Sequence, residues 1–94
     1  MEFKNKKVSV LMTVFNAEEY LEESIQSVLS QTHKDFELII VDDFSNDSSK
    51  RIIKNFVDER IKFFSLSKKI GRTKALNFGL EKCNSKFIAI QDAD

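Results

Sequence analysis

The residues best suited to chemistry are two aspartates at the end of the sequence. Asp92 and Asp94 follow the apolar run Phe87–Ile90, which predicts a short strand buried on both faces, as in parallel sheets. Open α/β sheets bind ligands beyond the carboxyl ends of their strands. Two carboxylates there are hard oxygen ligands that suit Mg²⁺ or Mn²⁺ carrying a phosphate. An Asp-x-Asp triplet also arises by chance as a polar fringe, so the other strands must decide between these readings.

A second acidic pair follows another apolar run. Asp42 and Asp43 come directly after residues 36–41. Because parallel strands end at the same edge of a sheet, we expect this pair to line one cleft with Asp92 and Asp94. Crowded carboxylates repel and raise one another's pKa, so a cation or a hydrogen-bonded ligand would relieve the crowding. The alternative is that Asp42 or Asp43 only caps the following helix.

The elements that must position these acids alternate between strands and helices. The order strand-helix, three times repeated and closed by a strand, predicts a parallel sheet with right-handed crossovers. If the strand order reverses after the third strand, the first and fourth strands become neighbours and a crevice opens between them. The expected strands are 8–14, 36–41, 61–66 and 87–90. The first expected helix runs from an N-cap at Asn16 to Leu29, and the third from about Thr73 to Cys83. The second expected helix is marked by one apolar face, made by Ile52, Ile53, Phe56 and Val57.

The third expected helix carries two kinds of apolar position. Leu76 and Leu80 are predicted on one face, while Ala75 and Gly79 are small enough to let the helix approach the sheet closely. Gly79 and Gly71 are the two glycines of the chain, which therefore contains neither a Gly-x-Gly-x-x-Gly turn nor a Walker A loop. The sequence therefore argues against a dinucleotide-dependent dehydrogenase or a P-loop ATPase.

The composition is that of one small globular domain spanning residues 1–94. Its 15 basic and 15 acidic residues cancel, so no global field recruits nucleic acid, which we do not expect as a partner. Cys83 is the only cysteine, which rules out an internal disulfide and favours an idle thiol. The start of the chain lacks a long apolar leader segment, and residues 8–14 are too short to span a bilayer. We therefore expect a cytoplasmic protein.

Taken together, these segments resemble the amino-terminal half of a family 2 glycosyltransferase with the GT-A fold. The resemblance covers essentially the whole chain, and its motifs stand in the family's order. It implies an α/β, three-layer Rossmann-like parallel sheet with helices on both faces. It also implies transfer of a sugar from a nucleotide-diphosphate sugar, expected to be UDP-linked, to an acceptor hydroxyl. The residues that carry it are Val8–Asn16, Ser27–Thr32, Phe36–Asp47 and Asp92-Ala93-Asp94.

The resemblance also implies which residues bind the nucleotide. Thr13 and Phe15 would border the base, with the Phe15 ring stacking on it, although the family usually has tyrosine there. Asp43 would hydrogen-bond the base while Asp42 sits behind it. Arg72 would match a basic residue near the base or the phosphates.

For the metal, the resemblance implies a role for the final triplet. Asp94 would bind Mg²⁺ or Mn²⁺ bridging the diphosphate, and Asp92 would reach the ribose and share in the metal site. Phe44 stands where the family frequently has glycine, which affects the shape of the loop more than its chemistry.

Other functions remain open at this point. A non-catalytic nucleotide- or metal-binding module fits the same residues, whereas a receiver-like signalling domain expects acids where Phe15 and Asn16 stand. Under the transferase reading, no catalytic base is expected in this chain, which should be inactive alone. A longer parent chain would supply the pocket for a carbohydrate or lipid-linked acceptor and any membrane association. Strand 87–90 is a further expected contact, as the edge that joins a homodimer.

Overall fold

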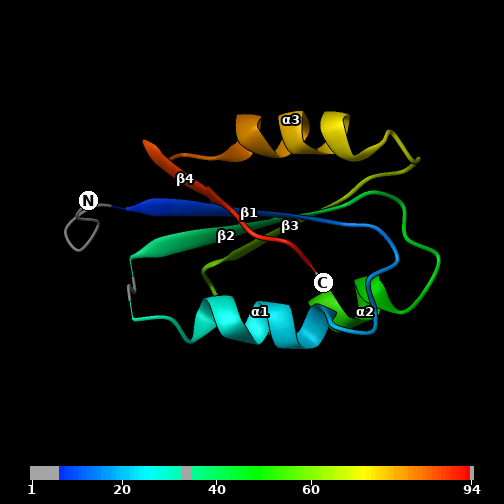
Figure 1. Ribbon diagram of the computed structural model, residues 1–94, viewed down its shortest axis with the longest axis horizontal. Helices are drawn as coiled ribbons and strands as arrows, with labels where there is room; N and C mark the ends of the chain where they lie inside the picture. Colours follow the sequence, from blue (N-terminus) through cyan, green and yellow to red (C-terminus); the bar gives the residue numbers. More distant parts are fainter. Residues whose placement is uncertain (1–6, 33–34, 94) are drawn as a thin grey trace.

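Four parallel strands form one sheet in the order β3-β2-β1-β4 (Figure 1). The computed structural model describes residues 7–32 and 35–93. The order reverses after the third strand, as predicted, because β1 pairs with both β2 and β4. Strands β1 and β4 are therefore neighbours, which is the condition for the crevice expected between them. The strands are β1 (Val8–Val14), β2 (Phe36–Asp42), β3 (Ile61–Ser65) and β4 (Phe87–Ile90).

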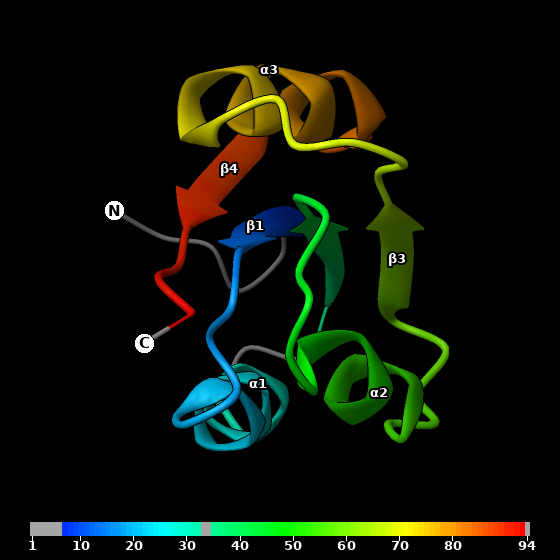
Figure 2. The same ribbon diagram turned by 90° about the vertical axis from the view of Figure 1, so that its right-hand side faces the viewer.

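Helices cover both faces of the sheet. Helices α1 (Leu21–Leu29) and α2 (Ser49–Lys54) lie under one face, and α3 (Arg72–Lys82) lies over the other (Figures 1 and 2). The predicted three-layer α/β class is therefore confirmed. Helix α1 forms because its apolar residues recur at the spacing that one helical face requires, and they are the ones buried against the sheet: Leu21, Ile25 and Val28.

The core has two parts because side chains alternate along each strand. Met12 and Ile40 point toward α1 and α2, while Leu11 and Ile39 point toward α3, and all four are fully buried. Burial on both faces is why β1 and β2 read as nearly continuous apolar runs. The same alternation decides, at the ends of the strands, which layer each polar side chain enters.

Helix α3 approaches the sheet closely through its small residues. Ala75 and Gly79 are its buried positions, and a Cβ added at Gly79 would overlap the Leu11 side chain and lie 3.2 Å from Val41 Cγ2. The expectation of a close approach is thus confirmed. Leu80, expected on the same buried face as Leu76, is instead 41% exposed. Because α3 lies so close to the sheet, only a narrow stripe of the helix surface is buried. The large side chain of Leu80 lies outside this stripe.

A buried carboxylate anchors the far end of α3 to the sheet. Glu37, on β2, is 1% exposed and accepts hydrogen bonds from the Ser9 hydroxyl and, at 2.8 Å, the Asn84 amide. Burial alone raises the pKa of Glu37, but these bonds and the nearby charge of Lys62 leave the pKa below its usual value.

Burial raises the pKa of the neighbouring Cys83 thiol, which donates to the Gly79 carbonyl at 3.4 Å.

Two expectations about helix ends are wrong. Asn16 is not an N-cap, since α1 begins at Leu21 and Asn16 has a φ of 50°. Its side chain instead accepts a hydrogen bond from the backbone of Asn46. Val57 does not lie on a buried helical face, because α2 ends at Lys54 and Val57 is 99% exposed.

Strand β4 is an edge strand, so the expectation of burial on both faces is wrong. Ile88 and Ile90 are 42% and 51% exposed, because β4 pairs only with β1 within the described residues. A homodimer through this edge stays a prediction.

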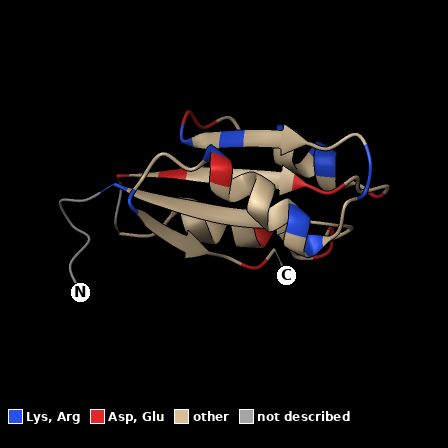
Figure 3. Ribbon diagram, turned by 90° about the horizontal axis from the view of Figure 1, so that it is seen from above, with Lys and Arg blue, Asp and Glu red and all other residues tan. Residues whose placement is uncertain are grey.

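The surface charges of the described residues are mixed. Basic and acidic segments are interspersed over the face seen from the α3 side (Figure 3). Within the described part of the chain, none of the helices has the length and apolar content needed to cross a membrane. The cytoplasmic location stays a prediction.

The close contact between α3 and the sheet predicts the effect of enlarging Gly79. Gly79→Leu should lower the free energy of unfolding by about 1–3 kcal/mol, because the added atoms overpack the space that Leu11 and Val41 fill. Urea unfolding monitored by circular dichroism measures the change. Glu81→Leu, at an exposed position of the same helix, is the control and should change stability little. Equal stability of the two variants would contradict the tight packing.

Candidate functional site

A pocket of about 250 Å³ opens at the carboxyl edge of the sheet. It brings together residues from the ends of β1 and β2, from the loop before α3 and from the segment after β4. Every residue predicted to bind the nucleotide lies around it, whereas Asp94, the predicted metal ligand, falls outside the described residues. The lining consists of Thr13, Val14, Phe15, Ala17, Asp43, Lys69, Arg72, Ala75, Asp92 and Ala93.

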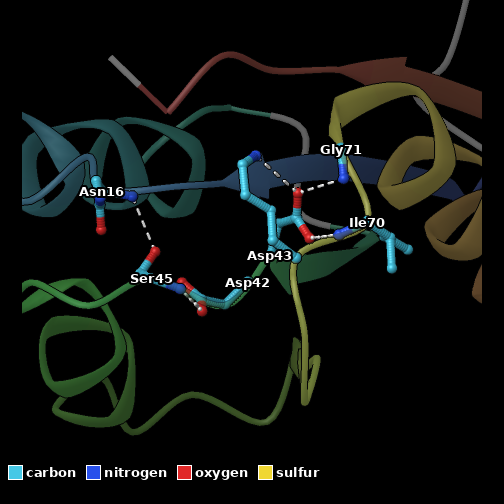
Figure 4. A network of polar contacts seen from close by, with 7 residues as sticks. Asn16, Asp42, Asp43, Ser45, Ile70 and Gly71 are labelled. Carbon is cyan, nitrogen blue, oxygen red and sulfur yellow. Dashed lines mark hydrogen bonds and ion pairs between the residues drawn. The ribbon is translucent and has the colours of Figure 1, made fainter.

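Asp43 joins the end of β2 to the loop before α3. Its side chain is 3% exposed, and its two oxygens accept hydrogen bonds from the amides of Ile70 at 2.8 Å and Gly71 at 2.9 Å (Figure 4). The ammonium of Lys69 lies 3.5 Å from Oδ2. Gly71 has a φ of 93°, which is readily adopted only by glycine. The carboxylate thus holds the loop that forms one wall of the pocket.

Asp42 enters the opposite layer, so the expected cleft of four carboxylates is wrong. Successive residues of a strand point to opposite faces, and the fully buried Asp42 side chain accepts a hydrogen bond from the Ser45 amide at 2.9 Å. It does not line the pocket. It caps the turn after β2 and not α2 itself, which begins at Ser49. The position of Asp42 behind Asp43 is the arrangement that the resemblance implied.

Phe15 presents an aromatic face to the pocket. The residue is 43% exposed, so its ring does not belong to the core. The ammonium of Lys69 lies 3.9 Å from the ring centroid, a distance typical of a cation–π contact. A flat, partly exposed ring beside a buried carboxylate can hold a planar heterocycle by stacking and hydrogen bonding.

Arg72 and Asp92 face each other at the mouth of the pocket. Arg72 is the first residue of α3, and its Nη2 lies 3.6 Å from Asp92 Oδ1. Both side chains are more than 60% exposed, at 64% and 72%, so water screens the pair and it contributes little to stability. The Ser24 hydroxyl holds the adjoining segment by donating to the Ala93 carbonyl at 2.8 Å. Both charged groups are therefore free to turn toward a ligand.

The described residues contain no complete metal centre. Within residues 7–32 and 35–93, no three histidine, cysteine, aspartate or glutamate side chains come close enough to hold an ion. Asp92 offers one exposed carboxylate at the pocket mouth. The second ligand expected from the sequence is Asp94, of which the structure says nothing.

Two loops beside the pocket are fastened together, and we call this contact the loop clasp. It joins residues 16–18, after β1, to residues 45–49, after β2, and in each bond a side-chain oxygen of one loop accepts from the backbone of the other. The bonds run from the amides of Asn16 to Ser45 (Figure 4), Ala17 to Ser49, Glu18 to Asp47, Asn46 to Asn16 and Ser48 to Glu18.

Asp47, one of the two acids in the loop clasp, stays charged at neutral pH. Burial raises the pKa of Asp47, but the hydrogen bonds from Ser49 and from the Glu18 amide outweigh it and lower the pKa below its usual value. A carboxyl whose pKa is lowered on folding stabilises the fold above its unfolded pKa and ceases to do so as the pH falls through its folded pKa. The loop that carries Phe15 is therefore held in place under neutral conditions.

Sequence reasoning did not find every residue of the pocket. Lys69 was not among the residues predicted for the site, although it contacts both Phe15 and Asp43. The signal available was its place between the third strand and Gly71, which brings the loop to the carboxyl edge of the sheet. Ser45 was not predicted for the site either, because its partner Asn16 stands 29 residues earlier in the sequence.

Comparison with known proteins gives a family match over nearly the whole chain. The sequence profile described as "Glycosyl transferase family 2" matches residues 9–94. An uncharacterized glycosyltransferase of Haemophilus influenzae is 42% identical, over 93% of this chain and 36% of the relative. The Escherichia coli UDP-Glc:alpha-D-GlcNAc-diphosphoundecaprenol beta-1,3-glucosyltransferase WfgD is 38% identical, over 93% of this chain and 34% of the relative. The chain thus spans about a third of the length of these relatives.

Solved structures share the fold. TarS 1-349 of S. aureus in complex with UDP-GlcNAc superposes with a TM-score of 0.87 at 28% identity, covering 94% of this chain and 26% of the TarS 1-349 chain. The mannosyltransferase PcManGT from Pyrobaculum calidifontis, solved with GDP-Man and Mn²⁺, has a TM-score of 0.83, covering 95% of this chain and 28% of that protein. Its 23% identity makes that likeness one of fold.

The bonds made by Asp43 predict how the loop before α3 responds to mutation. In Asp43→Asn, one of the two acceptor oxygens becomes an amide nitrogen, so the Ile70 or Gly71 amide loses its partner. Hydrogen exchange measured by NMR should become faster at these amides. Asp92→Asn removes a carboxylate from the same pocket without touching either amide, and should leave their exchange unchanged. Unaltered exchange in Asp43→Asn would contradict the anchoring role.

Proposed function

Because the chain belongs to glycosyl transferase family 2, we propose that it is the donor-binding part of a transferase that uses a UDP-linked sugar. The enzyme moves the sugar from the nucleotide diphosphate to an acceptor hydroxyl. The observation that carries the proposal is the meeting of the exposed Phe15 ring and the buried Asp43 carboxylate in one pocket.

The base is the part of the donor that this pair recognises. A uracil ring stacks on Phe15, and its ring N–H donates to Asp43, whose oxygens retain lone pairs beyond those used by the Ile70 and Gly71 amides. Thr13, half-buried at the end of β1, borders the same space. Aromatic stacking gives affinity, and the hydrogen bond to a buried acceptor gives selectivity for a base with a ring N–H.

The size of the pocket limits what it can hold. Its volume of about 250 Å³ lies below the roughly 300–1,000 Å³ usual for sites that enclose a whole ligand. A base and its ribose fill such a space, so the diphosphate and the sugar extend past Arg72 and Asp92 at the mouth. The TarS complex with UDP-GlcNAc supports a UDP-sugar as the ligand class.

Charges at the pocket mouth suit the diphosphate. Arg72 places a cation at the amino terminus of α3, where the helix dipole also favours an anion. We propose that Asp92, with Asp94, holds Mg²⁺ or Mn²⁺, and that Asp92 also reaches the ribose. The bound metal supplies a Lewis acid that stabilises the departing diphosphate. Before the donor binds, Arg72 offsets the charge of Asp92.

The acceptor belongs to the rest of a longer protein. WfgD acts, by its name, on a diphosphoundecaprenol-linked sugar, and we propose a carbohydrate or lipid-linked acceptor for the parent of this chain. A non-catalytic nucleotide-binding module is the second candidate. The observation that favours it is that the exposed ring of Phe15 and the buried carboxylate of Asp43 suit binding of a nucleobase whether or not turnover follows.

Binding of UDP tests the proposal. Calorimetry of the 94-residue chain with UDP should give a saturable isotherm in Mn²⁺ and weaker binding in chelator. Phe15→Ala should weaken binding by about 5–150-fold, because stacking on an aromatic ring is worth roughly 1–3 kcal/mol per base. Tyr20→Ala, at an exposed ring outside the pocket, is the matched control. If UDP does not bind under either condition, the donor-binding proposal is wrong, and equal affinity in both conditions removes the metal.

Turnover separates the two candidate functions. We expect the 94 residues to bind the donor without transferring or hydrolysing its sugar. We expect the longer parent chain both to bind the donor and to transfer its sugar. A coupled assay that detects the release of UDP from UDP-GlcNAc measures the turnover of each chain. Release by the short chain that disappears in Asp92→Asn would show that the catalytic groups lie within residues 1–94. A parent chain that binds UDP-sugars without turnover would favour the non-catalytic module.

A further inference from the structure

We propose that Lys69 occupies the place of the nucleobase in the free protein and that the base must displace it in order to bind. The inference rests on the proposed function, because it assigns a role within the same pocket. It identifies Lys69 as a residue that sets the affinity and selectivity of the site. No contact of Lys69 with a ligand is needed for this role.

A single ammonium group makes both of the contacts that a base would make. Lys69 Nζ lies 3.9 Å from the centroid of the Phe15 ring, over its face, where a stacked base would sit. The same nitrogen lies 3.5 Å from Asp43 Oδ2, where a ring N–H of a base would donate. A base and the ammonium therefore compete for the same ring face and the same oxygen.

The remaining contacts of Asp43 do not depend on Lys69. The amides of Ile70 and Gly71 bond to Asp43 at 2.8 and 2.9 Å, close to the ideal length, whereas the lysine contact at 3.5 Å is long. Removing the ammonium therefore leaves the carboxylate with two strong partners and frees a lone-pair direction on Oδ2. That vacancy suits the ring N–H of a base.

Lys69 can leave without disturbing the fold. Its side chain is 50% exposed, so the displaced ammonium can move into water, which solvates it well. A lysine stem is long and flexible, and a partly exposed cation–π contact is weak. The ammonium thus covers an otherwise exposed aromatic face and gives way only to a ligand that replaces both contacts.

The opposite role for Lys69 is that of a direct ligand to the base or the phosphates. If Lys69 is a direct ligand, removing its side chain weakens binding of the nucleotide. If Lys69 is a competitor, removing its side chain strengthens that binding. Uridine separates the two roles because it carries no phosphate, so loss of a positive charge does not act through the diphosphate. Lys68, which is exposed and adjacent but does not line the pocket, provides a matched control with the same change in charge.

The first measurement is the position of Lys69 in the free chain. In the NMR spectrum, the ε-methylene protons of Lys69 should be shifted upfield relative to those of Lys68, because they lie over the Phe15 ring. The shift should vanish in Phe15→Leu and on addition of uridine or UDP. Resonances of Lys69 at the same position as those of Lys68, or an upfield shift that persists in the bound state, would overturn the inference.

The second measurement is the affinity for uridine, by NMR titration of the wild type, Lys69→Ala and Lys68→Ala. Lys69→Ala should bind uridine about 3–10-fold more tightly than the wild type, the range expected for losing a weak competing cation–π contact and ion pair. Lys68→Ala should match the wild type. An unchanged or lower affinity in Lys69→Ala overturns the inference while binding of UDP still upholds the proposed function; failure of all three proteins to bind UDP removes both.

Discussion

The burial of the Asp43 carboxylate is the constraint on which the candidate site depends. A carboxylate taken out of water is costly unless hydrogen bonds and a counter-charge compensate it. Here the amides of Ile70 and Gly71 supply the hydrogen bonds, and Lys69 adds a more distant, half-exposed counter-charge that the site can do without. The loop before α3 must therefore hold one conformation, which includes the positive φ of Gly71, and this fixes where Arg72 begins the helix. One side chain at the end of β2 thus determines the opposite wall of the pocket.

The alternation that builds the core also divides the polar groups at its edge. Asp42 and Asp43 are neighbours in sequence, but the strand sends the first toward α1 and α2 and the second toward α3. Asp42 then organises the turn that follows, through Ser45, while Asp43 organises the loop before α3. Directly after the two aspartates the chain turns sharply at Phe44, which has a φ of 65°. This conformation costs a residue with a side chain roughly 1–2 kcal/mol.

The sequence was sufficient for features that depend on neighbours along the chain. Strand-length apolar runs and helical periodicity predicted all seven elements, and the crossover lengths predicted their parallel arrangement. The wrong expectations concern features that depend on distant partners. Asn16 was expected to cap α1, but its partners come from the loop after β2. Ile88 was expected to be buried, but its exposure follows from strand order. The contact between Lys69 and Phe15 joins the ends of two non-adjacent strands, and no local pattern encodes it.

The loop clasp has a consequence for how these sequences can diverge. In each of its bonds the donor is a backbone amide and the acceptor is a side-chain oxygen, so each loop recognises the main chain of the other and not its side chains. A change in one loop then needs no compensating change in the other, provided that a donor position does not become proline and an acceptor keeps a side-chain oxygen within reach of the amide. The two loops can therefore drift independently while the ring of Phe15 keeps its place.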